Sequence, residues 1–139
     1  MEFIVVGIRL SHCFTISISG ETYIEPGVPY KVTCTVSNPL DNRKTSYSAK
    51  ISNDEETDFF IHYLQTDRCV YRALTSLQPC QRDLCSCDMN GLATHWTYNT
   101  PTNLSSTTFR CTSKNNELNL NSSNAWIPTV PSKCLKYLW

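Results

Sequence analysis

Eight cysteines in a chain of 139 residues constrain the fold more strongly than any other feature of the sequence. Cytosolic proteins of this length rarely carry so many, so the cysteines either pair as disulfides in an oxidising compartment or bind a metal ion. Two N-glycosylation sequons, at Asn103 and Asn121, agree with the first alternative. We therefore expect an extracellular protein, secreted or displayed on a cell surface. The cysteines are Cys13, Cys34, Cys69, Cys80, Cys85, Cys87, Cys111 and Cys134.

Composition excludes one broad class of partner. The 12 basic and 12 acidic residues cancel to a net charge of zero, whereas binding to nucleic acid requires an excess of Lys and Arg. Charged residues make up 17% of the chain, below the ~25% that is usual in globular domains. The chain is also rich in Ser, Thr and Asn, so we expect a polar, weakly charged surface of the kind common in extracellular β domains.

The two ends of the chain frame a single expected domain. Residues 3–8 are apolar, but Arg9 ends the run, which is shorter than the apolar part of a complete secretory signal. No run approaches the ~18–20 apolar residues of a membrane span, so no transmembrane segment is predicted. We expect an N-terminal segment over 1–18, either a truncated signal peptide or a misassigned exon. One domain over 19–131 and a C-terminal tail over 132–139 follow it.

Alternation of apolar and polar residues is the main secondary-structure signal. Every second side chain from Tyr30 to Val36 is apolar, which is typical of a half-buried strand. The same pattern predicts strands over 30–37 and 107–113. Similar runs predict strands over 14–18, 47–52, 59–64, 69–74, 92–98 and 125–130. Several short strands without a helical period predict an all-β antiparallel sandwich or barrel.

The end of the predicted domain is less regular. A polar stretch over 115–124 predicts a long hairpin loop between the last two strands. Pro128 lacks a backbone N–H, so the strand expected over 125–130 should lie at a sheet edge.

Two cysteines carry a resemblance to a known fold. Cys34 and Cys111 fall in the middle of predicted strands, on their inward faces, where such a pair can bridge two packed sheets. The arrangement resembles an immunoglobulin-like domain, with 30–37 as strand B and 107–113 as strand F. The resemblance implies a core disulfide between Cys34 and Cys111.

Two hallmarks of that family differ in this sequence. Tyr47 or Ile51 would take the place of the core tryptophan expected on strand C. Phe109 stands at the tyrosine-corner position, where it can pack but offers no hydroxyl.

A narrower resemblance rests on three stretches. Residues 80–98 hold a dense cysteine cluster and a tryptophan-containing strand, 104–111 lead into Cys111, and 125–130 include a Trp and a Pro. Together they resemble the cysteine-rich immunoglobulin-like domains of molluscan secreted and cell-surface proteins, including the amino-terminal domains of fibrinogen-related and other immune lectins.

This resemblance implies both a fold and a function. The implied fold is an immunoglobulin-like antiparallel β-sandwich with extra disulfides. The implied function is that of a non-catalytic recognition or adhesion module of an innate immune protein or receptor ectodomain, with a protein or glycan ligand. The alternative is a structural spacer that positions a separate effector or lectin domain.

The remaining six cysteines allow several connectivities. Cys80 and Cys85 could close a small loop, and Cys69 and Cys87 could clamp that loop to the neighbouring strand. Cys13 and Cys134 flank the domain, so they could join its two ends or stay unpaired.

Metal binding is the alternative reading of two polar clusters. Zinc could use Cys80, Cys85, Cys87 and His95, but their spacing lacks the paired short intervals of structural zinc sites. An acidic run could bind calcium, but it lacks the alternating ligands and the turn glycine of an EF-hand loop. We expect no metal and no cofactor. The acidic run comprises Asp54, Glu55, Glu56 and Asp58.

No catalytic motif surrounds the histidines. His12, His62 and His95 lie outside every nucleophile-elbow, zincin or catalytic-cysteine context, so we expect structural or surface histidines and no enzyme.

Aromatic residues fall into two groups. Trp96, Tyr98 and Phe109 are expected in the core. Phe60, Tyr63 and Tyr71 lie on strands that could form the outer part of one sheet, where exposed rings would make a protein-binding face.

Overall fold

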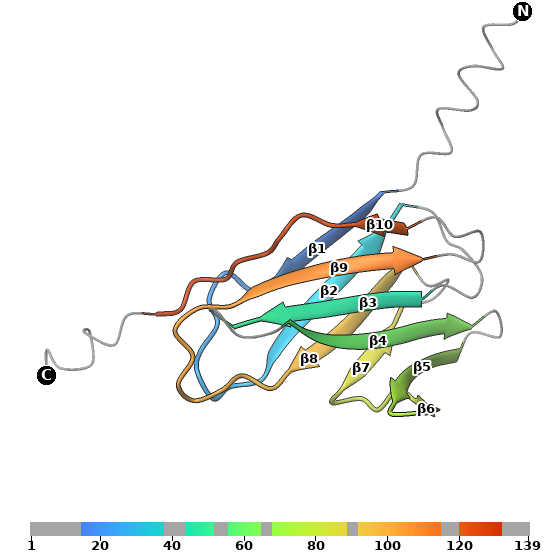
Figure 1. Ribbon diagram of the computed structural model, residues 1–139, viewed down its shortest axis with the longest axis horizontal. Helices are drawn as coiled ribbons and strands as arrows, with labels where there is room; N and C mark the ends of the chain where they lie inside the picture. The colour runs from blue at the N-terminus through green and yellow to red at the C-terminus, as the bar shows by residue number, and fades with distance from the viewer. Residues whose placement is uncertain are drawn as a thin grey trace, which may run out of the picture.

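The computed structural model describes residues 15–37, 44–51, 56–64, 68–88, 92–114 and 120–131. In these ranges the chain forms two antiparallel sheets that pack face to face (Figure 1). The four-stranded sheet has the order β1 (Ile16–Gly20), β2 (Tyr30–Val36), β8 (Ala93–Tyr98) and β7 (Cys85–Cys87). The six-stranded sheet has the order β10 (Leu120–Ser122), β9 (Thr108–Lys114), β3 (Lys44–Lys50), β4 (Thr57–Leu64), β5 (Arg68–Ala73) and β6 (Ser76–Pro79). The predicted antiparallel β-sandwich with extra disulfides is confirmed.

The strand at the centre of the four-stranded sheet follows its sequence pattern. Alternate side chains of β2, from Tyr30 to Val36, are buried, while those between them are half-buried or exposed. β2 pairs with β8 in a register that sets Val32 opposite Trp96. Burial of one face therefore fixes this register, because a slip by one residue would turn every apolar side chain to solvent.

The core is an aromatic cluster centred on Trp96. Its ring stacks on Phe59, with centroids 5.3 Å apart and planes 6° from parallel. The rings of Tyr47, Tyr98 and Phe109 meet it edge to face. The indole thus comes from β8, and Tyr47 on β3 is fully buried beside it. The core assignment of Trp96, Tyr98 and Phe109 is confirmed.

The predicted arrangement of the last strands was wrong. The strand β10 lies inside the stretch expected to be a loop, and residues 125–130 form only isolated bridges, at Trp126 and Thr129. The Ser123 hydroxyl accepts a hydrogen bond from the Cys111 backbone N–H at 2.9 Å. This side-chain bond replaces a ladder bond and ends the regular pairing of β10 with β9.

Other boundaries also shift. β3 begins at Lys44 and ends at Lys50, earlier than the predicted 47–52. β1 pairs with β2 from Ile16 onward, so the sandwich begins before the expected residue 19. The strands β6 and β7 were not predicted, because β6 is exposed along its whole length and β7 has three residues.

The structure separates the three aromatic residues that the sequence analysis placed in the outer part of one sheet. Tyr63 is buried, since its position on β4 faces the opposite sheet, and Tyr71 is half-buried with its ring stacked on Phe59. Phe60 follows the inward-facing Phe59 on β4. Because successive side chains of a strand point to opposite faces, Phe60 points away from the core.

Candidate functional site

Three disulfides join the described strands. Cys34 on β2 is bonded to Cys111 on β9, with Cα atoms 6.0 Å apart, and links the two sheets through the core. The other two bonds connect Cys69 to Cys87 and Cys80 to Cys85. These are the same three pairs that the sequence analysis favoured. Cys13 and Cys134 lie outside the described residues.

The second and third disulfides form one cluster around β5, β6 and β7. Cys69 and Cys80 are cross-strand neighbours, since the Cys80 backbone N–H donates to the Cys69 carbonyl at 2.9 Å. Their sulfur atoms lie 3.4 Å apart, in van der Waals contact. Cys87 ties this hairpin to β7 of the other sheet. Because the sulfurs are all in disulfide bonds, none is a thiolate that could bind zinc, so the zinc alternative fails.

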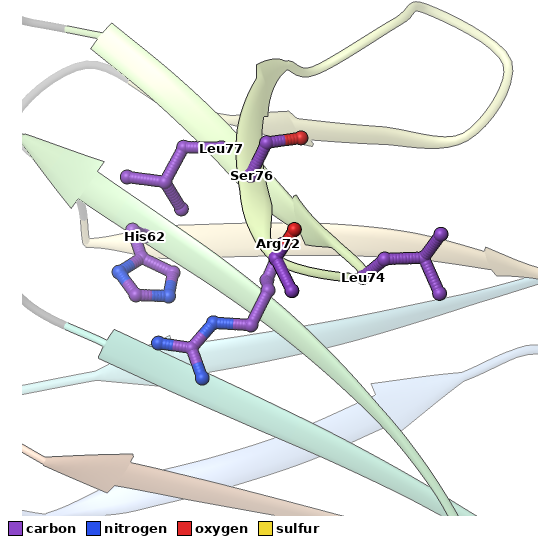
Figure 2. Close-up of a pocket in the computed structure, with 6 residues that line it drawn as sticks. His62, Arg72, Leu74, Ser76 and Leu77 are labelled. Carbon is purple, nitrogen blue, oxygen red and sulfur yellow. The ribbon is translucent and has the colours of Figure 1, made fainter.

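A pocket opens where this hairpin curves over β4. It is an open hollow of about 550 Å³ on the surface, lined by His62, Arg72, Leu74, Thr75, Ser76 and Leu77 (Figure 2). We call it the hairpin pocket. In this view Arg72 and Leu77 lie on either side of the His62 ring.

Strand alternation places the pocket on the outer face of the six-stranded sheet. Phe59 and Tyr71 point into the core, where their rings stack with Trp96 and with each other. Neighbouring side chains on β4 and β5 must therefore point away from the four-stranded sheet. His62 and Arg72 are on this outer face, and His62 is buried beneath the hairpin.

Arg72 supplies the positive charge of the hairpin pocket. Its guanidinium carbon lies 5.8 Å from the centroid of the Phe60 ring, within the range of a cation–π contact. Among the residues that the structure describes, no carboxylate forms an ion pair with Arg72. Within the described ranges, the Phe60 ring is therefore the group that positions this charge.

The tip of the β5–β6 hairpin has an unusual backbone. Ala73 pairs with Ser76, so Leu74 and Thr75 form a two-residue loop. Leu74 has a φ of 56°, in the left-handed region that disfavours residues with a Cβ. Its side chain is 97% exposed, so packing does not compensate this cost.

Hydrogen bonds at the tip fix the hydroxyl of Ser76. Its Oγ donates to the Ala73 carbonyl at 3.4 Å and accepts from the Gln78 side-chain amide at 3.1 Å. Leu77, which pairs with Arg72 across the hairpin, is 49% exposed. The pocket therefore combines a cation, a fixed hydroxyl and two exposed leucines.

A second polar network crosses the outer face of the four-stranded sheet. His95 Nδ1 lies 2.8 Å from the Thr33 hydroxyl, and His95 Nε2 lies 3.1 Å from a carboxylate oxygen of Asp88. The order hydroxyl, imidazole, carboxylate is that of a hydrolase triad. However, Thr33 and His95 are direct register partners, and the Asp88 side chain is 60% exposed. We interpret the network as cross-strand hydrogen bonding on a solvated face.

The two sequons differ in position. Asn103 is exposed in the β8–β9 connection, which lies at the opposite end of the sandwich from β6 (Figure 1). A glycan on Asn103 would therefore leave the hairpin pocket uncovered. Asn121 lies on β10 opposite Ser113, and the third residue of its sequon, Ser123, is buried.

The other candidate residues do not gather into a site. Asp54, Glu55 and His12 lie outside the described residues, while Glu56 and Asp58 are exposed at the start of β4. Within the described ranges, no three His, Cys, Asp or Glu side chains come together as metal ligands.

Sequence reasoning missed the residues that make the hairpin pocket. It considered His62 only as a structural histidine, and it did not single out Arg72, Leu74 or Leu77. The available signal was the run from Arg72 to Gln78, which places two leucines in a mostly polar segment between two cysteines.

Comparison with protein-family models and with curated protein sequences finds no match to this chain. No helix in the described part of the chain is long and apolar enough to span a membrane.

Proposed function

We propose that this chain is an immunoglobulin-like recognition module that acts outside the cell by binding a protein or glycan partner. The strand order carries the proposal. The order β1-β2-β8-β7 corresponds to strands A, B, E and D of an immunoglobulin domain, and β10-β9-β3-β4-β5 corresponds to G, F, C, C′ and C″ of the variable type. The Cys34–Cys111 disulfide then joins the equivalents of strands B and F.

The disulfides support an extracellular site of action. Structural disulfides persist in oxidising compartments and are rare in the cytosol. Three of them are present among the described residues, and two anchor the hairpin that carries the pocket. The exposed sequon at Asn103 agrees with secretion.

The hairpin pocket favours binding over catalysis. It presents the Arg72 cation, the Ser76 hydroxyl and the exposed side chains of Leu74 and Leu77, which are groups that orient a ligand. The Thr33–His95–Asp88 network lies on the other sheet and does not line this pocket. The sequence resemblance to molluscan immune proteins directs the search for partners to microbial and self surfaces.

A spacer is the second candidate function, and one observation favours it. The described chain enters the sandwich at Thr15 and leaves it at Pro131, toward opposite ends of its long axis (Figure 1). A domain that separates two neighbours along a chain needs this geometry. A spacer, unlike a recognition module, would bind no surface partner by itself.

A binding screen separates the two functions. The full chain, secreted and fully oxidised, would be tested against microbial cells, glycan arrays and extracts of self surfaces. The same chain after reduction and alkylation is the control for nonspecific adhesion. Saturable binding by the oxidised chain alone is the expected result. Equal binding by both forms, or none by the oxidised form, would overturn the recognition function.

A further inference from the structure

The guanidinium of Arg72 gives the hairpin pocket a positive charge that a planar anion would complement. A guanidinium group is permanently charged and presents its N–H donors in a fixed fork that matches a carboxylate. Arg72 is held over the Phe60 ring, so its orientation is restricted before any ligand arrives. No carboxylate in the described ranges pairs with Arg72, so an external carboxylate would displace none of them.

The exposed leucines at the edge of the pocket could contact an aliphatic group of a ligand. Leu74 occupies a left-handed backbone position where glycine would fit without strain, and its side chain is almost fully exposed. Both features cost stability in the isolated domain. Backbone strain combined with an exposed apolar side chain at the edge of a pocket points to contact with a partner. Leu77, on the adjoining strand, lies across the Arg72 stem from Leu74, and together they are the apolar side chains at the edge of the hollow (Figure 2).

We propose that the hairpin pocket binds a carboxylate that carries an aliphatic group, such as the carboxyl-terminal Leu, Ile or Val residue of a polypeptide. The carboxylate would pair with Arg72, and the aliphatic side chain would pack against Leu74 and Leu77. A uronic acid shares the carboxylate but lacks the aliphatic group, so the leucine rim favours the peptide terminus. This inference rests on the proposed recognition function and names the class of ligand for its pocket.

Three small probes test the two halves of the proposal. The full oxidised chain, labelled with nitrogen-15, would be titrated near neutral pH with N-acetyl-leucine, its neutral amide and glucuronate. N-acetyl-leucine should shift the amide resonances of residues 72–77, with a dissociation constant on the order of 1 mM for so small a ligand. The amide and glucuronate should each bind at least about tenfold more weakly. Equal binding of the amide would overturn the role of Arg72, and equal binding of glucuronate would overturn the role of the leucine rim.

Two arginine variants provide the matched control. Arg110 is exposed on β9, on the same outer face of the sheet as Arg72, but it does not line the pocket. Arg72→Gln should weaken binding of N-acetyl-leucine at least about tenfold, while Arg110→Gln should leave it unchanged. Preserved amide dispersion in both spectra shows that the fold is intact. Equal effects of the two substitutions would indicate nonspecific charge attraction and would overturn the site.

Arg72→Lys gives an independent measurement. It keeps the charge but loses the planar fork, so binding should fall between the wild-type and Arg72→Gln values. Binding as strong as that of the wild type would mean that the planar fork contributes nothing, and it would overturn the proposed fork-to-carboxylate pairing. If the wild-type chain ignores N-acetyl-leucine but still binds a surface partner in the screen, the ligand class is wrong while the recognition function stands.

Discussion

The phenol of Tyr47 on β3 is hydrogen-bonded to the hydroxyl of Thr94 on β8, beside the disulfide that joins the two sheets. Thr94 is the register partner of Cys34 in one sheet, and Tyr47 is the register partner of Cys111 in the other. The sheets are thus connected twice at one level of the core, once by a covalent bond and once by a buried polar pair.

The polar pair should behave as a unit. Tyr47→Phe leaves the buried Thr94 hydroxyl without its partner, and we expect it to lower the free energy of unfolding by about 1–3 kcal/mol. Thr94→Val removes one partner of the phenol, which keeps its hydrogen bond with the Cys34 backbone, so this substitution should cost less than Tyr47→Phe. The double substitution removes both polar groups and should cost clearly less than the sum of the two. Denaturant unfolding under oxidising conditions measures all three. Tyr23→Phe, at an exposed position, is the control and should change little.

Buried phenols should also make the fold sensitive to alkali. Burial raises the pKa of Tyr47 above its ordinary value of 10.0, and hydrogen bonds with Thr94 and the Cys34 backbone lower it by less. Burial likewise raises the pKa values of Tyr30 and Tyr98. Above pH 10, the unfolded chain loses these phenolic protons while the folded chain keeps them, so the folded state binds more protons there. The contribution of these protonated phenols to the free energy of unfolding is therefore complete below pH 10 and is lost as the pH rises further.

The measurement is the free energy of unfolding at several pH values on both sides of pH 10. The decline above pH 10 should be shallower in Tyr47→Phe, because one of the shifted groups is gone. An identical slope in the variant and the wild type would show that Tyr47 ionises at the same pH in both states.

The three disulfides should contribute unequally. The Cys34–Cys111 bond has a sequence separation of 77, whereas the separation for Cys80–Cys85 is 5. Loop-closure entropy then predicts losses of about 4.5 kcal/mol for a Cys34→Ala/Cys111→Ala variant and about 2 kcal/mol for Cys80→Ala/Cys85→Ala. Thermal unfolding of the two double variants tests this order. The reverse order would mean that the cysteine cluster stabilises the fold through native packing rather than by limiting the unfolded chain.

Strands with one buried face could be predicted from the sequence. In β2 the alternating pattern reports burial directly, so Val32 was identified as inward before its register was known, whereas Trp96 on β8 was assigned to the core as an aromatic residue on a predicted strand. The strand β6 has no such pattern, because all four of its residues are exposed and only pairing with β5 makes it a strand. The residues of β6 alone do not indicate that it pairs with β5.

The hairpin pocket could not be predicted for a related reason. It depends on the register that sets Leu77 opposite Arg72 and on the left-handed backbone of Leu74. A leucine gives no sequence signal for a positive φ, whereas a glycine or an asparagine at that position would have suggested a tight turn. Likewise, the contact between Thr33 and His95 depends on the pairing of β2 with β8, which separate segments of the chain supply.

Leu74 should show opposite effects on stability and binding. Replacing it with glycine removes backbone strain of roughly 1–2 kcal/mol, partly offset by the greater entropy of glycine in the unfolded chain. We therefore expect Leu74→Gly to raise the free energy of unfolding by up to about 1 kcal/mol, while binding of N-acetyl-leucine weakens because the apolar rim is shortened. Leu77→Gly is the matched control. It removes the other exposed leucine at a regular strand position, so it should weaken binding and lower stability by roughly 0.5–1 kcal/mol. A loss of stability in Leu74→Gly would show that the side chain is retained for folding, and the argument from strain to binding would then fail.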